Sequence, residues 1–216
     1  MKSNGVLKTI NDNDTTNLLH NIDELDSTFE KDEKIRLISY HFRKIMEVMG
    51  LDLDDDSLRD TPARVARMYV NEIFSGLDPA NEPAISLFEN KYAYKGMIVE
   101  RNITVHSWCE HHFVPITGKA HVAYIAGEKV IGLSKLNRIV HYYCSRPQVQ
   151  ERLTEDIAAH LKKVLDTPDV AVVIDAVHHC VASRGIADVN SSTYTAHYSG
   201  QFLSDEMKKE FLSAIR

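Results

Sequence analysis

One segment limits the fold more than any other, the run DVAVVIDAVHHC at residues 169–180. Its β-branched and apolar residues predict a strand that is buried on both faces. Apolar residues alternate with other residues in IVERNITV (98–105) and in GKAHVAYIA (118–126), which predicts two more strands, and STYTAHYSG (192–200) predicts a fourth. The chain is therefore expected to build a sheet around one very apolar strand.

Helical patterns surround these strands. Apolar residues recur at helical spacing in SKLNRIVHYY (134–143) and PQVQERLTEDIAAHLKKVL (147–165), and DEMKKEFLSAIR (205–216) predicts a closing helix. Before the strands, one amphipathic helix is predicted from residue 32 to Gly50, and a second starts at Thr61. This order predicts an α+β fold with mainly antiparallel strands.

The sequence divides into three regions. Residues 1–31 are rich in Asn, Asp and Thr and are expected to form a mobile arm. Residues 32–95 are expected to form a helical N-terminal region, and residues 96–216 contain the predicted strands.

Charge and composition argue against several classes of protein. The formal charge of −6, without a basic cluster, is not that of a protein that binds duplex nucleic acid. No apolar run reaches the roughly 18 residues of a membrane span, and the N-terminus lacks the apolar stretch of a signal peptide, so we expect a cytoplasmic protein without a membrane anchor. Three cysteines, Cys109, Cys144 and Cys180, do not suggest a disulfide framework, which favours metal binding or catalysis.

The tetrapeptide CEHH, residues 109–112, contains the spacing C-x-x-H, which allows Cys109 and His112 to converge on one metal ion. On the strand predicted for 169–180, His178 and Cys180 share a face, and Cys180 can add a third ligand. Three protein ligands with a free fourth position are typical of catalytic zinc, whereas structural zinc usually has four. Spacing alone leaves a chance arrangement open.

The remaining histidines and Cys144 form two groups. His111 and His178 adjoin the predicted ligands, where a neutral imidazole can carry protons near pH 7. His179, His197 and Cys144 fit structural roles, and Cys144 is expected to be a buried apolar residue on a helix.

Basic residues mark two candidate anion sites. Lys135 and Arg138 follow Ser134 at the predicted start of a helix, where cations and free backbone N–H groups attract anions. Solvated surface charge explains the same pattern equally well. Arg64 and Arg67 lie on the polar side of the helix that starts at Thr61, and on sequence alone solvated charges are the favoured interpretation.

Gln150 and Glu151 fall in the first turn of a predicted helix. The Glu151 carboxylate can offset the helix dipole, which is the favoured interpretation on sequence alone. Beside an amide, it could instead accept two N–H donors from a guanine edge.

Five segments in this order and spacing resemble GTP cyclohydrolase I: CEHHFVPITGKAHVAYI, VIGLSKLNRIV, RPQVQERLT, AVHHC and SRGI. The resemblance runs from about residue 32 to the C-terminus and includes TPARVARMYVNEIFSGLD. It implies a tunnelling fold (T-fold) over 96–216, with an antiparallel sheet and two packed helices. It also implies conversion of GTP to 7,8-dihydroneopterin triphosphate and formate, the first step of tetrahydrofolate or other pterin synthesis, by an allosteric homodecamer with shared active sites.

The resemblance implies a role for each matched residue. The implied zinc ligands are Cys109, His112 and Cys180. The implied catalytic residues are His111, His178, Ser134 and Glu151, with the two histidines assisting protonation of the base and hydrolysis of the formyl intermediate. The implied GTP contacts are Gln150 and Glu151 at guanine, Lys135, Arg138 and Arg184 with Ser134 around the ribose and triphosphate, and Arg64 and Arg67 reaching from a neighbouring subunit.

Two rival functions stay open. A related pterin or deazapurine enzyme without the ring-opening step is disfavoured because the complete set of cysteines and histidines is present. A non-catalytic purine-nucleotide binding module with structural zinc would need a fourth protein ligand. His111 is the nearby candidate for that ligand.

Overall fold

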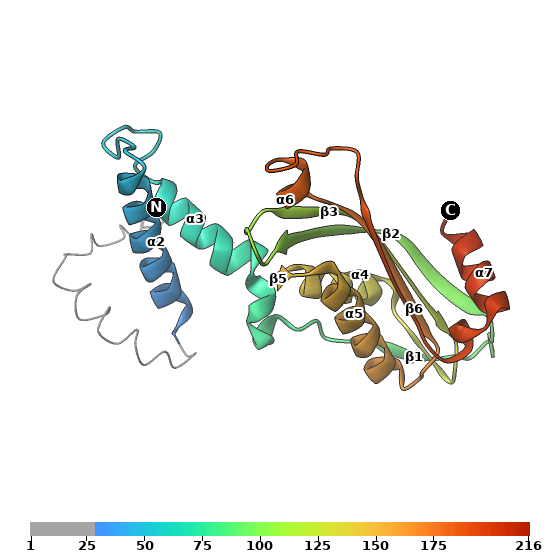
Figure 1. Ribbon diagram of the computed structural model, residues 1–216. Helices are drawn as coiled ribbons and strands as arrows, with labels where there is room; N and C mark the ends of the chain where they lie inside the picture. Colours follow the sequence, from blue (N-terminus) through green and yellow to red (C-terminus); the bar gives the residue numbers. More distant parts are fainter. Residues whose placement is uncertain (1–28) are drawn as a thin grey trace. The chain divides into compact units, whose positions relative to one another are not determined.

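The computed structural model describes residues 29–216, so the arm predicted over residues 1–31 lies almost entirely outside the described residues (Figure 1). The chain divides into two compact units, Met1–Ala66 and Arg67–Arg216, each of which is described by itself. The boundary expected between residues 95 and 96 falls inside the second unit and stays a prediction.

The described part of the first unit contains the two predicted helices, α2 (Lys31–Val48) and the beginning of α3 (Thr61–Met68). Leu37 and Met46 are the buried residues of α2. Gly50 follows α2 with φ of 76°, a left-handed conformation that glycine adopts at little cost and that ends a helix. The predicted first helix thus agrees with α2 to within two residues at each end, and the predicted start of the second helix at Thr61 is confirmed.

The second unit begins with short helical turns that follow α3. These are η2 (Tyr69–Ile73), η3 (Ser75–Leu77) and η4 (Pro79–Asn81). A small antiparallel sheet of β1 (Leu87–Glu89) and β4 (Lys129–Ile131) was not predicted, because strands of three residues are too short to show alternation.

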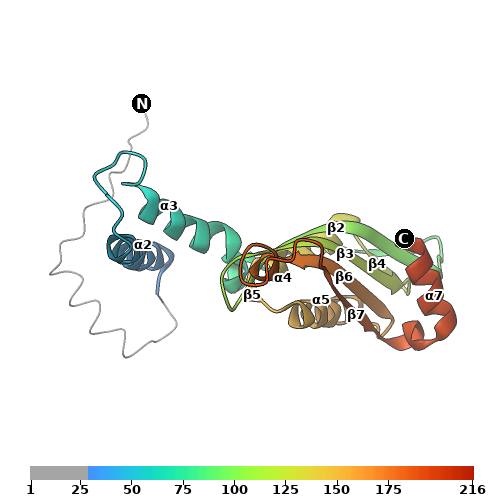
Figure 2. The same ribbon diagram turned by 45° about the horizontal axis from the view of Figure 1, so that its top comes forward.

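The main sheet has five strands in the order β5-β2-β3-β6-β7 (Figure 2). Four of them are the predicted strands, and their neighbouring pairs are antiparallel: β2 (Met97–Cys109), β3 (Pro115–Ile125), β6 (Val170–His178) and β7 (Thr193–Tyr198). The fifth strand, β5 (Pro147–Gln148), is parallel to the end of β2 and places Gln148 opposite Cys109.

Helices cover both faces of β6, which confirms the prediction of a strand buried on both sides. The helices are α4 (Leu133–Cys144), α5 (Gln150–Leu165) and α7 (Asp205–Ala214), preceded by the turn η5 (Gly200–Leu203). Leu136 of α4 and Ile157 of α5 are fully buried in one cluster with Ile174 of β6. Val173 faces the other way and belongs to a second cluster with Phe211 of α7. Figure 1 shows α4 and α5 together, apart from α7.

The predicted strand over 169–180 is shorter than expected. β6 ends at His178, and the next four residues form a helical turn, α6 (His179–Ala182), so the expectation that Cys180 continues the strand is wrong. The neighbouring strand explains this end. The pairing of β3 with β6 stops at Ile116 opposite His178, one residue from the first residue of β3, Pro115. Beyond His178, no residue of the chain is paired with β3 or β7.

Within residues 29–216, we find no helix that combines the length and the apolar character needed to cross a membrane.

Candidate metal centre

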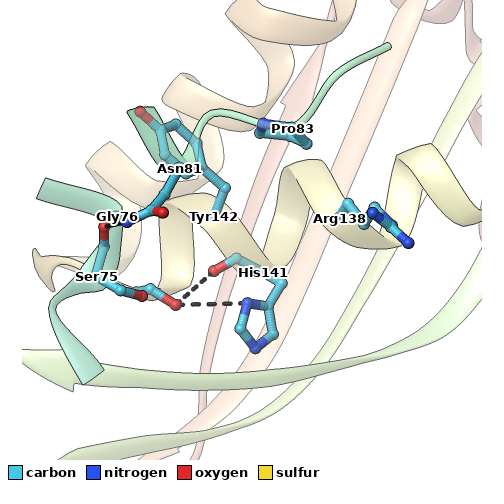
Figure 3. Close-up of a pocket in the computed structure, with 8 residues that line it drawn as sticks. Ser75, Gly76, Asn81, Pro83, Arg138, His141 and Tyr142 are labelled. Carbon is cyan, nitrogen blue, oxygen red and sulfur yellow. Dashed lines mark hydrogen bonds between the residues drawn. The ribbon is translucent and has the colours of Figure 1, made fainter. Parts of the chain in front are cut away.

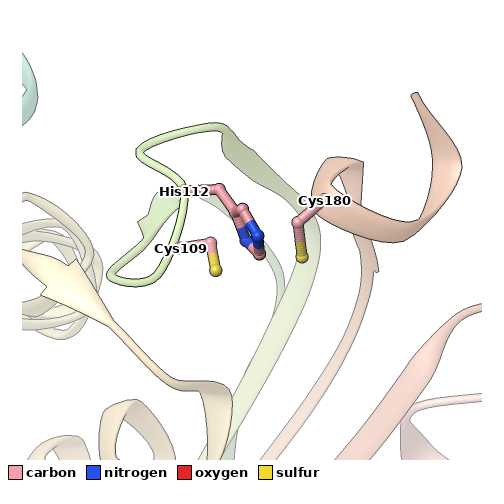
Figure 4. A group of neighbouring side chains, drawn as sticks. All are labelled: Cys109, His112 and Cys180. Atoms are coloured by element: carbon pink, nitrogen blue, oxygen red, sulfur yellow. The ribbon is translucent and has the colours of Figure 1, made fainter. Parts of the chain in front are cut away.

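Cys109, His112 and Cys180 come together at one end of the sheet (Figure 4). Cys109 is the last residue of β2, His112 lies in the turn between β2 and β3, and Cys180 lies in α6. Their possible ligand atoms all lie within 4.8 Å of one another. The helical turn therefore brings Cys180 to the other two side chains, although it is not on a strand.

The turn between β2 and β3 is closed by its own backbone. Cys109 N donates a hydrogen bond of 2.9 Å to Val114 O, and Phe113 N donates one of 2.8 Å to Cys109 O. Phe113 has φ of 52°, which makes the chain reverse direction within a few residues. This tight turn is what lets the C-x-x-H spacing direct two side chains to one point.

The donor set fits a zinc ion. Tetrahedral zinc has bonds of about 2.0–2.3 Å and so holds neighbouring ligand atoms about 3.3–3.8 Å apart, which a group within 4.8 Å reaches by small side-chain movements. Burial, together with the adjacent Cys109 thiol, raises the pKa of Cys180. A cation between the two sulfurs would reverse this effect, since it stabilises thiolates.

An ion pair holds the turn from outside. Arg152 on α5 donates from Nη2 to Glu110 Oε2, and the same nitrogen donates to Pro147 O at 2.8 Å. Arg152 Nε donates to Gln148 Oε1 at 3.0 Å. Glu110 N donates in turn to Gln148 O at 3.0 Å. Glu110, between the two predicted ligands in the turn, is thus tied to β5 and α5. Sequence reasoning missed this contact, because the pattern of the chain does not reveal a pair that is 42 residues apart.

His111 lies beside the metal-ligand group, which consists of Cys109, His112 and Cys180. Its Nδ1 is 3.7 Å from Cys109 Sγ, and its side chain is 64% exposed. An exposed imidazole next to a predicted ligand fits a proton carrier. The same position allows the rival interpretation of His111 as a fourth ligand.

Arg184, predicted to bind the triphosphate, lies at the same place. Its Nη1 donates to His112 Nε2 at 3.0 Å. A neutral imidazole has a single lone pair, and arginine is only a donor. A metal ion and Arg184 therefore compete for His112.

His178 and Glu151 lie close to each other at the end of β6 and the start of α5. Burial lowers the pKa of His178, and the negative charge of Glu151 acts in the opposite direction. Glu151 is exposed in the first turn of α5, as predicted. Gln150 is 1% exposed, and His178 Nε2 lies 2.8 Å from its Oε1. The Gln150 side chain is thus hydrogen-bonded inside the protein, and the contact with a guanine edge that the family resemblance implies for it stays a prediction.

The predicted anion residues of α4 lie away from the metal-ligand group. Ile131 N, just before α4, donates to the hydroxyl of Tyr124 near the far end of β3. At the other end of α4, Cys144 O accepts a hydrogen bond of 2.8 Å from Ser107, close to Cys109. Because a helix rises about 1.5 Å per residue, Ser134 lies about 15 Å along α4 from this contact. Within one chain, the structure does not bring Ser134 and Lys135 to the metal-ligand group.

Arg138 lines a cavity of about 210 Å³ on the exposed side of α4 (Figure 3). His141 and Tyr142 of α4 line it together with Asn81 and Pro83 from the connection before β1. Arg138 is exposed there and is free to meet a ligand from outside.

Arg64 and Arg67 are both exposed. Arg64 Nη2 lies 3.6 Å from Asp60 Oδ2 in a pair one helical turn apart. The exposure agrees with solvated charges and leaves both residues accessible to another molecule.

The residues that were interpreted as structural have protein partners. Cys144 is 1% exposed, which confirms the prediction that it is buried. His179 Nε2 lies 3.1 Å from Thr117 Oγ1, and His197 Nδ1 lies 2.9 Å from a Glu155 oxygen.

Comparisons with known proteins identify the family of the chain. The family model for GTP cyclohydrolase I matches residues 38–216. A protein of Flavobacterium johnsoniae named GTP cyclohydrolase 1 is 56% identical over 194 residues, which is 90% of this chain and 86% of that protein. Proteins with the same name from Erwinia tasmaniensis and Citrobacter koseri are each 54% identical, over 87% and 90% of this chain and 85% and 86% of their own lengths. The chain therefore belongs to the GTP cyclohydrolase I family of hydrolases and has the tunnelling fold of that family.

Proposed function

We propose that this protein hydrolyses the imidazole ring of GTP, releases formate and forms 7,8-dihydroneopterin triphosphate, the first step of tetrahydrofolate or other pterin synthesis. The observation that carries the proposal is the meeting of Cys109, His112 and Cys180 within 4.8 Å, with candidate proton carriers beside them. Membership of the family and relatives named GTP cyclohydrolase 1 support the same reaction.

Zinc is the proposed metal, and Cys109, His112 and Cys180 are its proposed ligands. Two sulfurs and one imidazole nitrogen are soft and borderline donors that favour zinc over magnesium or calcium. Bound there, zinc would supply a Lewis acid that lowers the pKa of a coordinated water towards neutrality.

The chain's own residues move protons and hold the base. His111 and His178 are proposed to exchange protons with the purine and with the formyl intermediate, since both imidazoles lie at this end of the sheet. Glu151 is proposed to accept N–H donors of guanine, because its carboxylate is exposed and acts on His178. Guanine would then lie between Glu151 and the metal-ligand group.

The triphosphate requires several cations in a chain of charge −6. Arg184 lies next to His112. We propose that Arg184 contacts the triphosphate bound at the site of its own chain. Ser134 and Lys135 lie near the end of α4 that is remote from Cys109, and Arg138 lies near the middle of α4, so we propose that these residues serve an active site completed by another copy of the chain. Arg64 and Arg67 are proposed to reach the triphosphate across a subunit boundary.

These separations favour a homo-oligomer, and we propose the homodecamer that the family resemblance implies. In such an assembly each active site takes residues from more than one subunit, so that isolated chains would bind GTP poorly. Dilution that dissociates the oligomer should therefore also abolish the activity.

The alternative is a non-catalytic purine-nucleotide binding module with structural zinc. It is favoured by one distance, the 3.7 Å between His111 Nδ1 and Cys109 Sγ, which places His111 within reach of a fourth ligand position. Replacement of His111 separates the two proposals, because a fourth ligand and a proton carrier fail in different ways.

The experiment compares zinc content and formate release in the wild type, His111→Ala and Cys180→Ser. The enzyme proposal expects His111→Ala to keep zinc and to lose turnover, whereas Cys180→Ser loses both. Loss of zinc from His111→Ala, together with a wild type that binds GTP without releasing formate, would establish the binding module instead.

A further inference from the structure

The amide of Gln150 is fully engaged at the start of α5. Its Nε2 carries two hydrogens and lies 2.8 Å from Thr193 O, 3.1 Å from Thr195 Oγ1 and 3.2 Å from Ile174 O, so that one hydrogen is shared between two acceptors. Its Oε1 lies 2.8 Å from His178 Nε2. Gln150 is only 1% exposed, and its side chain connects α5 to β6, to β7 and to His178.

Two backbone carbonyls fix the orientation of this amide. Carbonyl oxygens only accept hydrogen bonds, so the –NH₂ group must face Ile174 O and Thr193 O. A flipped amide would place Oε1 against both carbonyl oxygens, so that acceptors would face each other without a hydrogen between them. The oxygen of Gln150 therefore faces His178.

An amide oxygen facing His178 determines where the imidazole keeps its proton. Because Oε1 only accepts, the ring nitrogen opposite it, Nε2, must carry the hydrogen. In the neutral ring the lone pair is then on Nδ1. No other side chain or backbone group of residues 29–216 hydrogen-bonds to that nitrogen.

We propose that Gln150 is a positioning residue that holds His178 as the Nε2–H tautomer and leaves Nδ1 as the nitrogen that exchanges a proton during the reaction. The tautomer follows from the hydrogen bonds alone. The role of Nδ1 in the reaction rests on the proposed function. Gln150 thereby has a role other than the direct guanine contact that the family resemblance implies.

A second hydroxyl supports the network without touching His178. Thr154 Oγ1 lies 2.7 Å from Thr195 Oγ1 and donates to Gln150 O at 2.9 Å. Thr154 is 2% exposed, so Thr154→Val removes a buried polar group next to Gln150 and keeps the volume nearly constant. It is a matched control for the cost of disturbing this network.

The test is solid-state NMR of the full-length, metal-loaded protein with ¹⁵N-labelled histidine, which reports the protonation of each ring nitrogen. Comparison with His178→Asn identifies the His178 signals. We expect a protonated Nε2 and an unprotonated Nδ1 in the wild type and in Thr154→Val, and a mixture of tautomers in Gln150→Met. In the same preparations, Gln150→Met should keep its zinc and lower kcat for GTP about tenfold or more, with KM changed less than about twofold.

Three results would overturn the inference. A wild-type spectrum with the proton on Nδ1 does so directly, and it needs no variant to fold. An unchanged tautomer in folded Gln150→Met would show that the amide does not control the ring. A raised KM with an unchanged kcat would return Gln150 to guanine binding. If the wild type releases no formate, the proposed function fails, while the spectra still decide the tautomer.

Discussion

Arg152→Met should loosen the turn between β2 and β3, which carries His112, and should weaken metal binding. Arg152 donates to Pro147 O, Gln148 Oε1 and the Glu110 carboxylate, and the side chains of its ion pair with Glu110 are 46% and 32% exposed. An exposed ion pair contributes about 0.2–1 kcal/mol, and each remaining hydrogen bond about 0.5–1.5 kcal/mol. We therefore expect the free energy of unfolding to fall by about 2 kcal/mol.

The affinity for zinc should fall about tenfold, as is common when a group that orients ligands is removed. Urea unfolding measures the stability, and competition with a coloured chelator measures the affinity. Arg43→Met is the matched control, because the Arg43–Glu47 pair at 3.0 Å has a similar exposure but lies in α2. It should cost less than about 0.5 kcal/mol and leave zinc affinity unchanged. If Arg152→Met binds zinc within about twofold of this control, the ion pair does not hold the ligands.

Gly118→Ala should lower the free energy of unfolding by about 3 kcal/mol in urea titrations, because its Cβ would collide with the carbonyl of Asp175 on the adjacent strand; a loss below about 1 kcal/mol would contradict this. Arg184→Ala should raise zinc affinity several-fold in chelator competition, since Arg184 competes for the His112 lone pair, and a weaker affinity would refute the competition. Burial raises the pKa of the Cys144 thiol from its ordinary value of 9.0 to about 12. The folded state thus keeps its proton longer than the unfolded state, so the contribution of Cys144 is intact below about pH 9 and is lost as the pH rises towards 12. Between pH 7 and 10, the free energy of unfolding of Cys144→Ala should fall less steeply than that of the wild type. Equal slopes for the two proteins would show that the Cys144 thiol does not cause the decline.

The main strands were predictable because burial leaves a periodic record in the sequence. Alternation in 98–105 and 118–126 and the apolar run in 169–180 correspond to β2, β3 and β6. The end of β6 was not predictable, because it depends on where β3 begins, at Pro115, and no local pattern reports that pairing. The short strands β1, β4 and β5 were not predicted, because two or three residues are too few to show the alternation of apolar and polar side chains.

The site was predictable only where spacing carries the chemistry. C-x-x-H places Cys109 and His112 together through a local turn, whereas Cys180 reaches them through α6, an element that the sequence did not predict. The sequence placed Gln150 in the first turn of a helix but could not show that its amide points inward. Contacts across the fold, such as the one between Arg152 and the turn, leave no local signal.

The proposed reaction is metal-dependent ring opening of GTP at Cys109, His112 and Cys180. The most direct measurement follows formate and the oxidised, fluorescent pterin from GTP and purified protein with zinc, then with a chelator, and then with zinc restored. We expect both products to form with zinc, to disappear on chelation and to return when zinc is restored. Tight binding of GTP without formate by the zinc-loaded protein would contradict it.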